Sequence, residues 1–191
     1  IHGDTNLVKY LAKKSKNENI KLIIIAGDLT FAEKSLKNLI GPFLENNRKI
    51  LLIPGNHESE TTVEFLSRKY KRVHNLHQEP FIHKKTGFFG SGTVDWGIKG
   101  NESYKLFKEL EKSHNKIKDL ERKIMITHMH PMGSDSEISG FQGSYGVFNA
   151  IEKFTPEILI NSHIHEMGGL QERINETMVV NVSRNPFIFE I

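Results

Sequence analysis

Five short motifs along the chain carry histidine, aspartate or asparagine, and most of them follow a short apolar run. They are His2-Gly3-Asp4, Gly27-Asp28-Leu29-Thr30, Gly55-Asn56-His57-Glu58, Thr127-His128-Met129-His130-Pro131 and Ser162-His163-Ile164-His165. Imidazole nitrogens together with carboxylate and amide oxygens suit divalent manganese, iron, zinc, cobalt or nickel. One carboxylate, such as Asp28, can bridge two ions, and two ions about 3.5 to 4 Å apart can hold a phosphoryl group and activate the water between them. These residue types therefore predict a two-metal centre.

The elements that must position these motifs alternate between strand and helix. Short apolar runs predict buried strands at Leu22–Ala26, Lys49–Ile53, Lys123–Thr127 and Glu157–Ile160. Apolar residues three or four apart predict helices at Thr5–Lys16, Glu33–Asn46, Thr61–Tyr70, Tyr104–Leu120 and Tyr145–Phe154. This alternation indicates an α/β fold. Because such sheets bind ligands at the carboxyl ends of their strands, we expect the five motifs to converge there.

Two regions follow a different pattern, with short alternating segments that are typical of antiparallel strands. One is Glu79–Val94, and the other pairs Gly169–Arg173 with Met178–Val182 around a turn at Asn175. Phe187–Ile191 could form a final strand. Together these segments predict a two-sheet sandwich flanked by helices.

Length and composition limit the alternatives. With 191 residues, the chain is long enough for one substantial core and short for two, so we expect a single domain over residues 1–191. It has no cysteine, which excludes disulfides, thiolate zinc sites and cysteine nucleophiles, and fits a cytoplasmic location. Since no apolar run approaches the roughly 18 to 20 residues of a membrane span, we expect no membrane partner.

The formal net charge is +3, but basic and acidic residues are interleaved, as in Lys105–Lys123, which is typical of a solvated helical face. We therefore expect no nucleic-acid partner, although a basic surface for one remains an alternative. The charged stretch 95–123, with Gly97 and Gly100 near its start, predicts a helical insertion or lid.

The order of the motifs resembles that of the calcineurin-like metallophosphoesterase family. The sequence has His-Gly, then Gly-Asp, then Gly-Asn-His-Glu, then a lone histidine after a strand, then His-x-His, from His2 to His165. The resemblance implies the four-layer α/β/β/α fold of that family. It also implies an enzyme that hydrolyses phosphomonoesters or phosphodiesters with two divalent ions, manganese first among them. Monoester and diester substrates both need the same metal clamp, so the sequence leaves that choice, and the natural substrate, open.

Carried over residue by residue, the resemblance assigns a role to each motif. It implies that Asp28 binds both ions, that His2 and His165 bind the first ion, and that Asn56, His128 and His163 bind the second. His57 would be no ligand but would assist the leaving oxygen. The implied mechanism is in-line attack on phosphorus by a hydroxide that bridges the ions.

The sequence departs from the family pattern at two positions. The first motif is usually Asp-x-His-Gly, and Ile1 stands at the x position. We therefore expect the natural protein to carry a preceding strand that ends in this aspartate. The second departure is Ser162, where glycine is usual, and we expect little consequence because serine is small.

Several residues near the motifs allow two interpretations. His130 could contact substrate, whereas the remaining histidines, His74, His77, His83 and His114, are expected to be structural or at the surface. Trp96 and the segment Phe141-Gln142-Gly143-Ser144-Tyr145 could line a substrate pocket or serve loop packing. A non-catalytic binding scaffold with the same fold is the alternative to an enzyme, but such scaffolds commonly lose the histidine that stands here at position 57.

Overall fold

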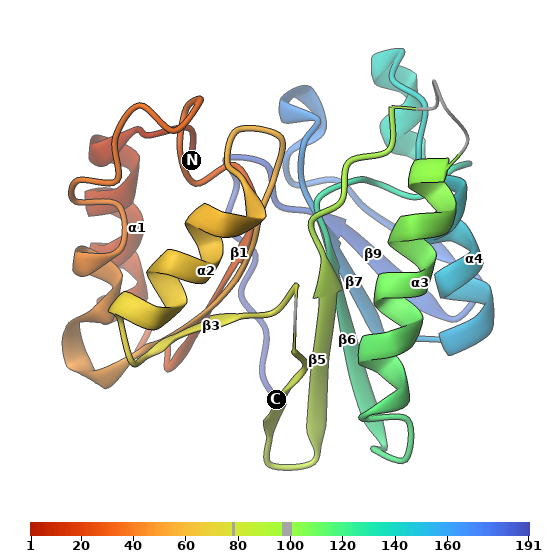
Figure 1. Ribbon diagram of the computed structural model, residues 1–191, viewed down its shortest axis with the longest axis horizontal. Coiled ribbons are helices and arrows are strands. Elements are labelled where there is room, and N and C mark those ends of the chain that lie inside the picture. The colour runs from red at the N-terminus through yellow and green to blue at the C-terminus, as the bar shows by residue number, and fades with distance from the viewer. Residues whose placement is uncertain (78, 97–100) are drawn as a thin grey trace.

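The computed structural model describes every residue except 78 and 97–100. Two β-sheets face each other, and each carries helices on its outer side, so that the layers follow the order α/β/β/α (Figure 1). The predicted fold class, a two-sheet sandwich flanked by helices, is confirmed.

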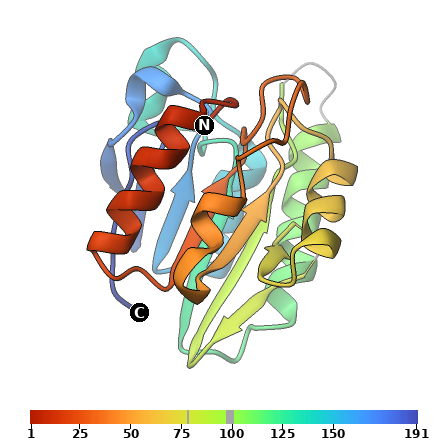
Figure 2. The same ribbon diagram turned by 90° about the vertical axis from the view of Figure 1, so that its left-hand side faces the viewer.

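The first sheet contains three parallel strands in the order β1-β2-β3. They are β1 (Leu22–Ala26), β2 (Lys49–Ile53) and β3 (Val73–Asn75). Two helices, α1 (Thr5–Asn17) and α2 (Glu60–Lys69), cover its outer face together with the 3-10 segment Gly41–Asn47 (Figure 2). Each α-helix has a side-chain N-cap, because Asp4 accepts from the amides of Asn6 and Leu7, and Ser59 accepts from that of Thr62.

The second sheet contains six strands in the order β4-β5-β6-β7-β9-β8. They are β4 (Phe81–His83), β5 (Thr86–Ser91), β6 (Arg122–Thr127), β7 (Ile158–Asn161), β8 (Gln171–Ile174) and β9 (Thr177–Asn181). The central four are parallel, and β4 and β8 are antiparallel edges. Both predicted antiparallel regions are therefore present, with the β8–β9 turn at Asn175 in the left-handed conformation (φ 51°).

The helices of the second half are α3 (Asn101–Asn115) and α4 (Tyr145–Phe154), which pack against each other. Two further 3-10 helices, Asp135–Ser139 and His165–Met167, lie in loops. Between the sheets, Leu51 and Ile53 of β2 belong to the same buried cluster as Phe88 and Ile126 of the second sheet. The apolar runs predicted as strands thus supply the core that holds the two sheets together.

Two features of the first half differ from the prediction. No helix spans 33–46, because Glu33, Asn38 and Asn46 all have positive φ and only the 3-10 segment Gly41–Asn47 forms. Leu39, Ile40 and Phe43 of this stretch are still buried, although they lie in successive turns and the 3-10 segment. The short strand β3 was not predicted at all.

The C-terminal stretch and the third helix also differ from the prediction. Phe187–Ile191 pairs with no strand in the described part of the chain, because Phe187, Phe189 and Ile191 pack against the apolar cluster between the sheets instead. Helix α3 ends at Asn115 rather than at Leu120. Residues 97–100, which belong to the predicted lid at 95–123, lie outside the described residues.

A groove of about 790 Å³ runs along β1, which forms one edge of the first sheet, and its other wall is the C-terminal segment. The groove reaches Asp28 and His163 at its upper end. Among the described helices, none combines the length and apolar character needed to cross a bilayer.

Candidate metal centre

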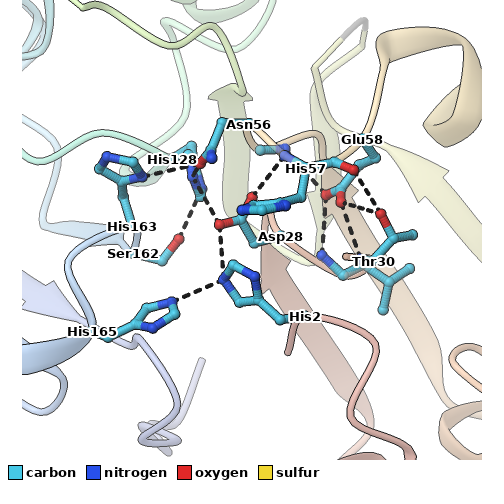
Figure 3. Close-up of polar contacts among 12 residues, drawn as sticks. His2, Asp28, Thr30, Asn56, His57, Glu58, His128, Ser162, His163 and His165 are labelled. Atoms are coloured by element: carbon cyan, nitrogen blue, oxygen red, sulfur yellow. Dashed lines mark hydrogen bonds and ion pairs between the residues drawn. The ribbon is translucent and has the colours of Figure 1, made fainter. Parts of the chain in front are cut away.

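The six predicted ligands lie together where strands of both sheets end (Figure 3). They are His2, Asp28, Asn56, His128, His163 and His165, and they are called the candidate centre below. Asp28 follows β1 and Asn56 follows β2 in the first sheet, whereas His128 follows β6 and His163 follows β7 in the second. The two sheets therefore contribute donors to one site because the carboxyl ends of their parallel strands lie at the same end of the sandwich.

Asp28 lies in the middle of the candidate centre and is buried. Its Oδ2 atom is 3.1 Å from Nε2 of His2 and 3.5 Å from Nε2 of His128. Its other oxygen, Oδ1, accepts a hydrogen bond of 3.1 Å from the backbone amide of His57. Asp28 is shared by two groups that could each hold an ion, one with His2 and His57 and one with His128 and His163. One carboxylate in this position could contact an ion on either side.

The hydrogen bonds of His128 determine which of its ring nitrogens is available. Nδ1 lies 2.9 Å from the carbonyl oxygen of Ala26 and 3.0 Å from Oγ of Ser162, which itself donates to the same carbonyl. Since both neighbours accept from the ring, Nδ1 carries the hydrogen and Nε2 keeps a lone pair. Ser162 thus supplies an acceptor that glycine could not, which the sequence-based expectation of little consequence overlooked.

The lone pair of His128 faces another acceptor. Its Nε2 atom is 2.9 Å from Oδ1 of Asn56, and the same oxygen is 3.1 Å from Nδ1 of His163. Two acceptors at this distance repel each other unless they share a positive charge. The nitrogen and oxygen donors of this half therefore fit a divalent cation.

The other half of the candidate centre pairs His2 with His165. Their Nε2 atoms lie 2.9 Å apart, and the two rings meet edge to face. Burial lowers the pKa of His2 to about 4 from its usual 6.5. Burial, followed by the nearby charge of His128, also lowers the pKa of His163 to about 4. Both rings are consequently neutral near pH 7, the form in which imidazole binds metal ions.

Strained backbone conformations aim three of these side chains. His2, Asp28 and His163 have φ values of 52°, 52° and 75°, a left-handed region that residues other than glycine seldom adopt. Such strain costs about 1 to 3 kcal/mol per residue and persists where surrounding structure enforces it, often at functional sites. Gly55 allows the approach, because a Cβ atom there would overlap the carboxylate and the amide of Asp28.

His57 lies beside the candidate centre in an orientation that defines its proton. The backbone amide of Ala32 donates to Nδ1 at 3.2 Å, so the hydrogen of the neutral ring is on Nε2. Phe31 stacks on the ring with centroids 5.1 Å apart, and the ring of His2 is 4.5 Å away. These contacts hold His57 next to the candidate centre with an N–H group available for donation.

Glu58 connects the two loops of the first sheet and is buried. Its carboxylate accepts from the backbone amides of Leu29, Thr30 and Gly55, each at 3.1 Å. Burial raises the pKa of Glu58, although these amides act in the opposite direction. Glu58 therefore supports the Asp28 loop.

Two histidines outside the predicted set are more deeply placed than the sequence suggested. His130 is fully buried, and its Nε2 atom hydrogen-bonds the carbonyl oxygen of Phe141 at 3.2 Å. His77 is buried next to Glu60 and Glu109, and these three form another group with the residue types of a metal site. No sequence motif connects these three residues, because they come from three separate segments.

Comparison with known proteins gives one family match and a set of structural neighbours. The family model for calcineurin-like phosphoesterases matches residues 1–167. No curated protein matches the sequence.

The structural neighbours share the fold at low sequence identity. The protein TT1561 of Thermus thermophilus has a TM-score of 0.75 and 16% identity over 95% of this chain and 86% of its own. A dimetal phosphatase from Danio rerio has a TM-score of 0.63 and 12% identity over 96% of this chain and 80% of its own. GAP50, described as the anchor in the inner membrane complex of Plasmodium, has a TM-score of 0.56 and 15% identity, over 94% and 66% of the two chains. At these identities the similarity shows the fold alone.

Proposed function

Because the chain belongs to the calcineurin-like phosphoesterase family, we propose that it hydrolyses a phosphomonoester or phosphodiester at the candidate centre. One observation carries the proposal. Asp28 is shared by two groups of residues that could each hold an ion, and in one of them the amide of Ala32 donates to Nδ1 of His57, which leaves the ring hydrogen on Nε2. A site that only held structural ions would have no use for this adjacent hydrogen-bond donor.

The proposed ligand sets follow the contacts within the candidate centre. Asp28 would bind both ions, His2 and His165 the first, and Asn56, His128 and His163 the second. This division is supported by the 2.9 Å approach of His165 to His2 and by the contacts of both His128 and His163 with Asn56. When bound, a pair of divalent ions supplies charge stabilisation for the phosphoryl oxygens and lowers the pKa of water. We propose manganese as the metal.

The residues of the chain provide the remaining parts of the reaction. Water would attack phosphorus in line with the ester oxygen, the bond from phosphorus to that oxygen would break, and the proton lost by the water would pass to the departing oxygen. His57, neutral and with its hydrogen on Nε2, would assist by donating a hydrogen bond to the departing oxygen as its negative charge develops. The Ala32 amide keeps Nδ1 unprotonated and thereby keeps the ring hydrogen on Nε2. Asp28 also fixes this loop, because its Oδ1 atom accepts from the amide of His57.

The test is hydrolysis of bis(4-nitrophenyl) phosphate and 4-nitrophenyl phosphate by the full-length protein, first after chelation and then after manganese is restored. We expect turnover of at least one ester to depend on metal and to vanish in Asp28→Ala. The ratio of the two rates would rank diester against monoester substrates. If none of the candidate metals restores turnover of either ester, the proposal is contradicted and a non-catalytic binding scaffold is favoured.

A further inference from the structure

Two large aromatic side chains are exposed beside the candidate centre. Trp96 is 55% exposed and meets the ring of His163 edge to face, with centroids 5.8 Å apart. Phe141 is 56% exposed and meets the same ring edge to face at 6.3 Å. Aromatic surface left in water next to a polar site is typical of a place where a ligand binds.

The segments that carry these two aromatics are held by buried polar groups. Asp95, which precedes Trp96, is buried and accepts a hydrogen bond of 2.8 Å from Oγ of Ser144, close to Phe141 in the chain. On the other side, the buried ring of His130 hydrogen-bonds the carbonyl oxygen of Phe141. The two segments are therefore connected to each other and to the strand that supplies His128.

Phe31, the third exposed aromatic near the candidate centre, has a different environment. One face of its ring stacks on His57, and the ammonium group of Lys34 lies 4.8 Å from its ring centroid. Phe31 thus orients His57, and its ring is already engaged by groups of the protein. Trp96 and Phe141 instead meet His163 at steep interplanar angles of 73° and 77°, and each keeps more than half of its surface exposed to solvent.

We propose that Trp96 and Phe141 form a subsite that binds a planar aromatic or heteroaromatic ring of the phosphoester substrate. The subsite lies on the His163 side of the candidate centre, whereas Phe31 and His57 lie near His2. Ring stacking in such a subsite contributes beyond the burial of apolar area, so it distinguishes a flat ring from an aliphatic group of equal size. This inference rests on the proposed function, since it assumes that the phosphoryl group occupies the candidate centre.

Trp96 is the only tryptophan of the chain, so its fluorescence reports on the subsite directly. The test measures binding of phenylphosphonate, cyclohexylphosphonate and methylphosphonate, which resist hydrolysis, to the full-length zinc-loaded protein. We expect phenylphosphonate to change the emission of Trp96 and to bind about threefold to tenfold more tightly than cyclohexylphosphonate. Methylphosphonate should bind at the centre without this change in emission.

A matched pair of variants assigns the preference to the subsite. Phe141→Leu should bring the affinity for phenylphosphonate close to that for cyclohexylphosphonate and leave methylphosphonate binding unchanged. Phe65→Leu is the control, because Phe65 is also exposed, at 50%, but lies on α2 beside Lys69. It should retain the full preference for the flat ring.

The outcomes separate this inference from the proposed function. Equal affinities for phenylphosphonate and methylphosphonate, together with metal-dependent hydrolysis, would overturn the subsite alone. Equal affinities for phenylphosphonate and cyclohexylphosphonate would show an apolar surface without preference for planar rings, and would likewise overturn it. Failure of all three phosphonates to bind, together with absence of turnover, would overturn the proposed function and the subsite with it.

Discussion

Two clusters in the molecule combine histidine with carboxylates, but their hydrogen bonds differ. One is the candidate centre, and the other, called the lysine cluster here, consists of Glu60, His77, Lys105 and Glu109. Both clusters bring together atoms that could bind a metal ion. In the candidate centre, lone pairs of His128 and Asn56 face each other at 2.9 Å. Such an arrangement favours a cation between them.

In the lysine cluster the donors and acceptors already match. The amide of Gly92 donates to Nδ1 of His77 at 3.1 Å, so the ring hydrogen is on Nε2, which lies 3.3 Å from Oε1 of Glu60. The ammonium of Lys105 lies 3.4 Å from Glu60 and 3.5 Å from Glu109. Lys105 therefore supplies the positive charge next to the two carboxylates. A metal ion at Nε2 of His77 would have to displace the ring hydrogen, and Nδ1 could not take that hydrogen because it already accepts from the amide of Gly92. Residue type alone therefore does not identify a metal site.

The largest difference between the clusters should appear in metal binding. Asp28→Asn removes the shared anionic ligand, and we expect metal affinity to fall by more than about 100-fold. Loss of a group that only hydrogen-bonds to a metal ligand already costs about 10 to 100-fold in affinity, so loss of a ligand itself should cost more. Glu109→Gln is the matched change in the lysine cluster and should leave affinity unchanged. Calorimetric titration with zinc measures both. A loss of affinity in Glu109→Gln would contradict the distinction drawn between the clusters.

Removal of His57 should separate catalysis from metal binding within the candidate centre. His57→Ala removes the hydrogen-bond donor to the departing oxygen, and we expect kcat to fall by about 10² to 10³-fold. Metal content should be unchanged, because the proposed ligands remain in place. Measurement of kcat together with bound metal by elemental analysis tests both statements. A variant with normal turnover would exclude the assigned role of His57.

Disruption of the lysine cluster should affect stability instead of catalysis. His77→Leu leaves the amide of Gly92 without its acceptor in a buried position, which should lower the free energy of unfolding by about 1 to 3 kcal/mol. We expect metal content and kcat to stay within about twofold of the wild type. Urea unfolding, followed by circular dichroism, provides the first value. If stability were unchanged but metal were lost, the lysine cluster would be a metal site after all.

The smallest effect concerns an ion-pair network at the surface, in which Lys108 and Lys153 both pair with Glu111. Hydrogen bonds from Lys108, followed by those from Lys153, lower the pKa of Glu111 to about 2 from its usual 4.5. The Glu111 carboxylate therefore binds a proton less readily in the folded state than in the unfolded state. Its ion pairs stabilise the folded state above pH 4.5, and this stabilisation is lost as the pH falls towards 2.

Glu111→Gln should therefore unfold slightly more easily than the wild type at neutral pH, and this difference should shrink as the pH falls below 4.5. Added salt should reduce it as well, since exposed ion pairs are screened. Urea unfolding across this pH range measures the difference. A difference that stayed constant with pH would show that Glu111 acts through packing and not through its charge.

Much of the fold could be predicted because apolar runs and their spacing report burial directly. Strand β1 and helix α4 have the predicted bounds. The helix predicted at 33–46 failed for an identifiable reason, since its apolar spacing was satisfied by turns with positive φ at Glu33 and Asn38. Spacing reports which residues are buried, but it does not distinguish a helix from a series of turns with the same buried residues.

The candidate centre was anticipated as a set of residues, but not as an arrangement of atoms. The motifs follow strands that end at a common edge, so their convergence could be expected before the structure was known. The hydrogen on Nδ1 of His128 depends on Ala26, a residue 102 positions away in the chain. The role of Ser162 and the lysine cluster also arise from contacts between distant segments.

The sequence by itself determined the chemical types of the donors, their attachment to strand ends and, through the absence of cysteine, the restriction to nitrogen and oxygen ligands. These properties belong to single residues and to their immediate neighbours in the chain. Only the tertiary structure decided which lone pairs face each other and which are paired with a lysine or an amide. The physical reason is that hydrogen-bond partners and tautomers are determined by packing of one sheet against the other.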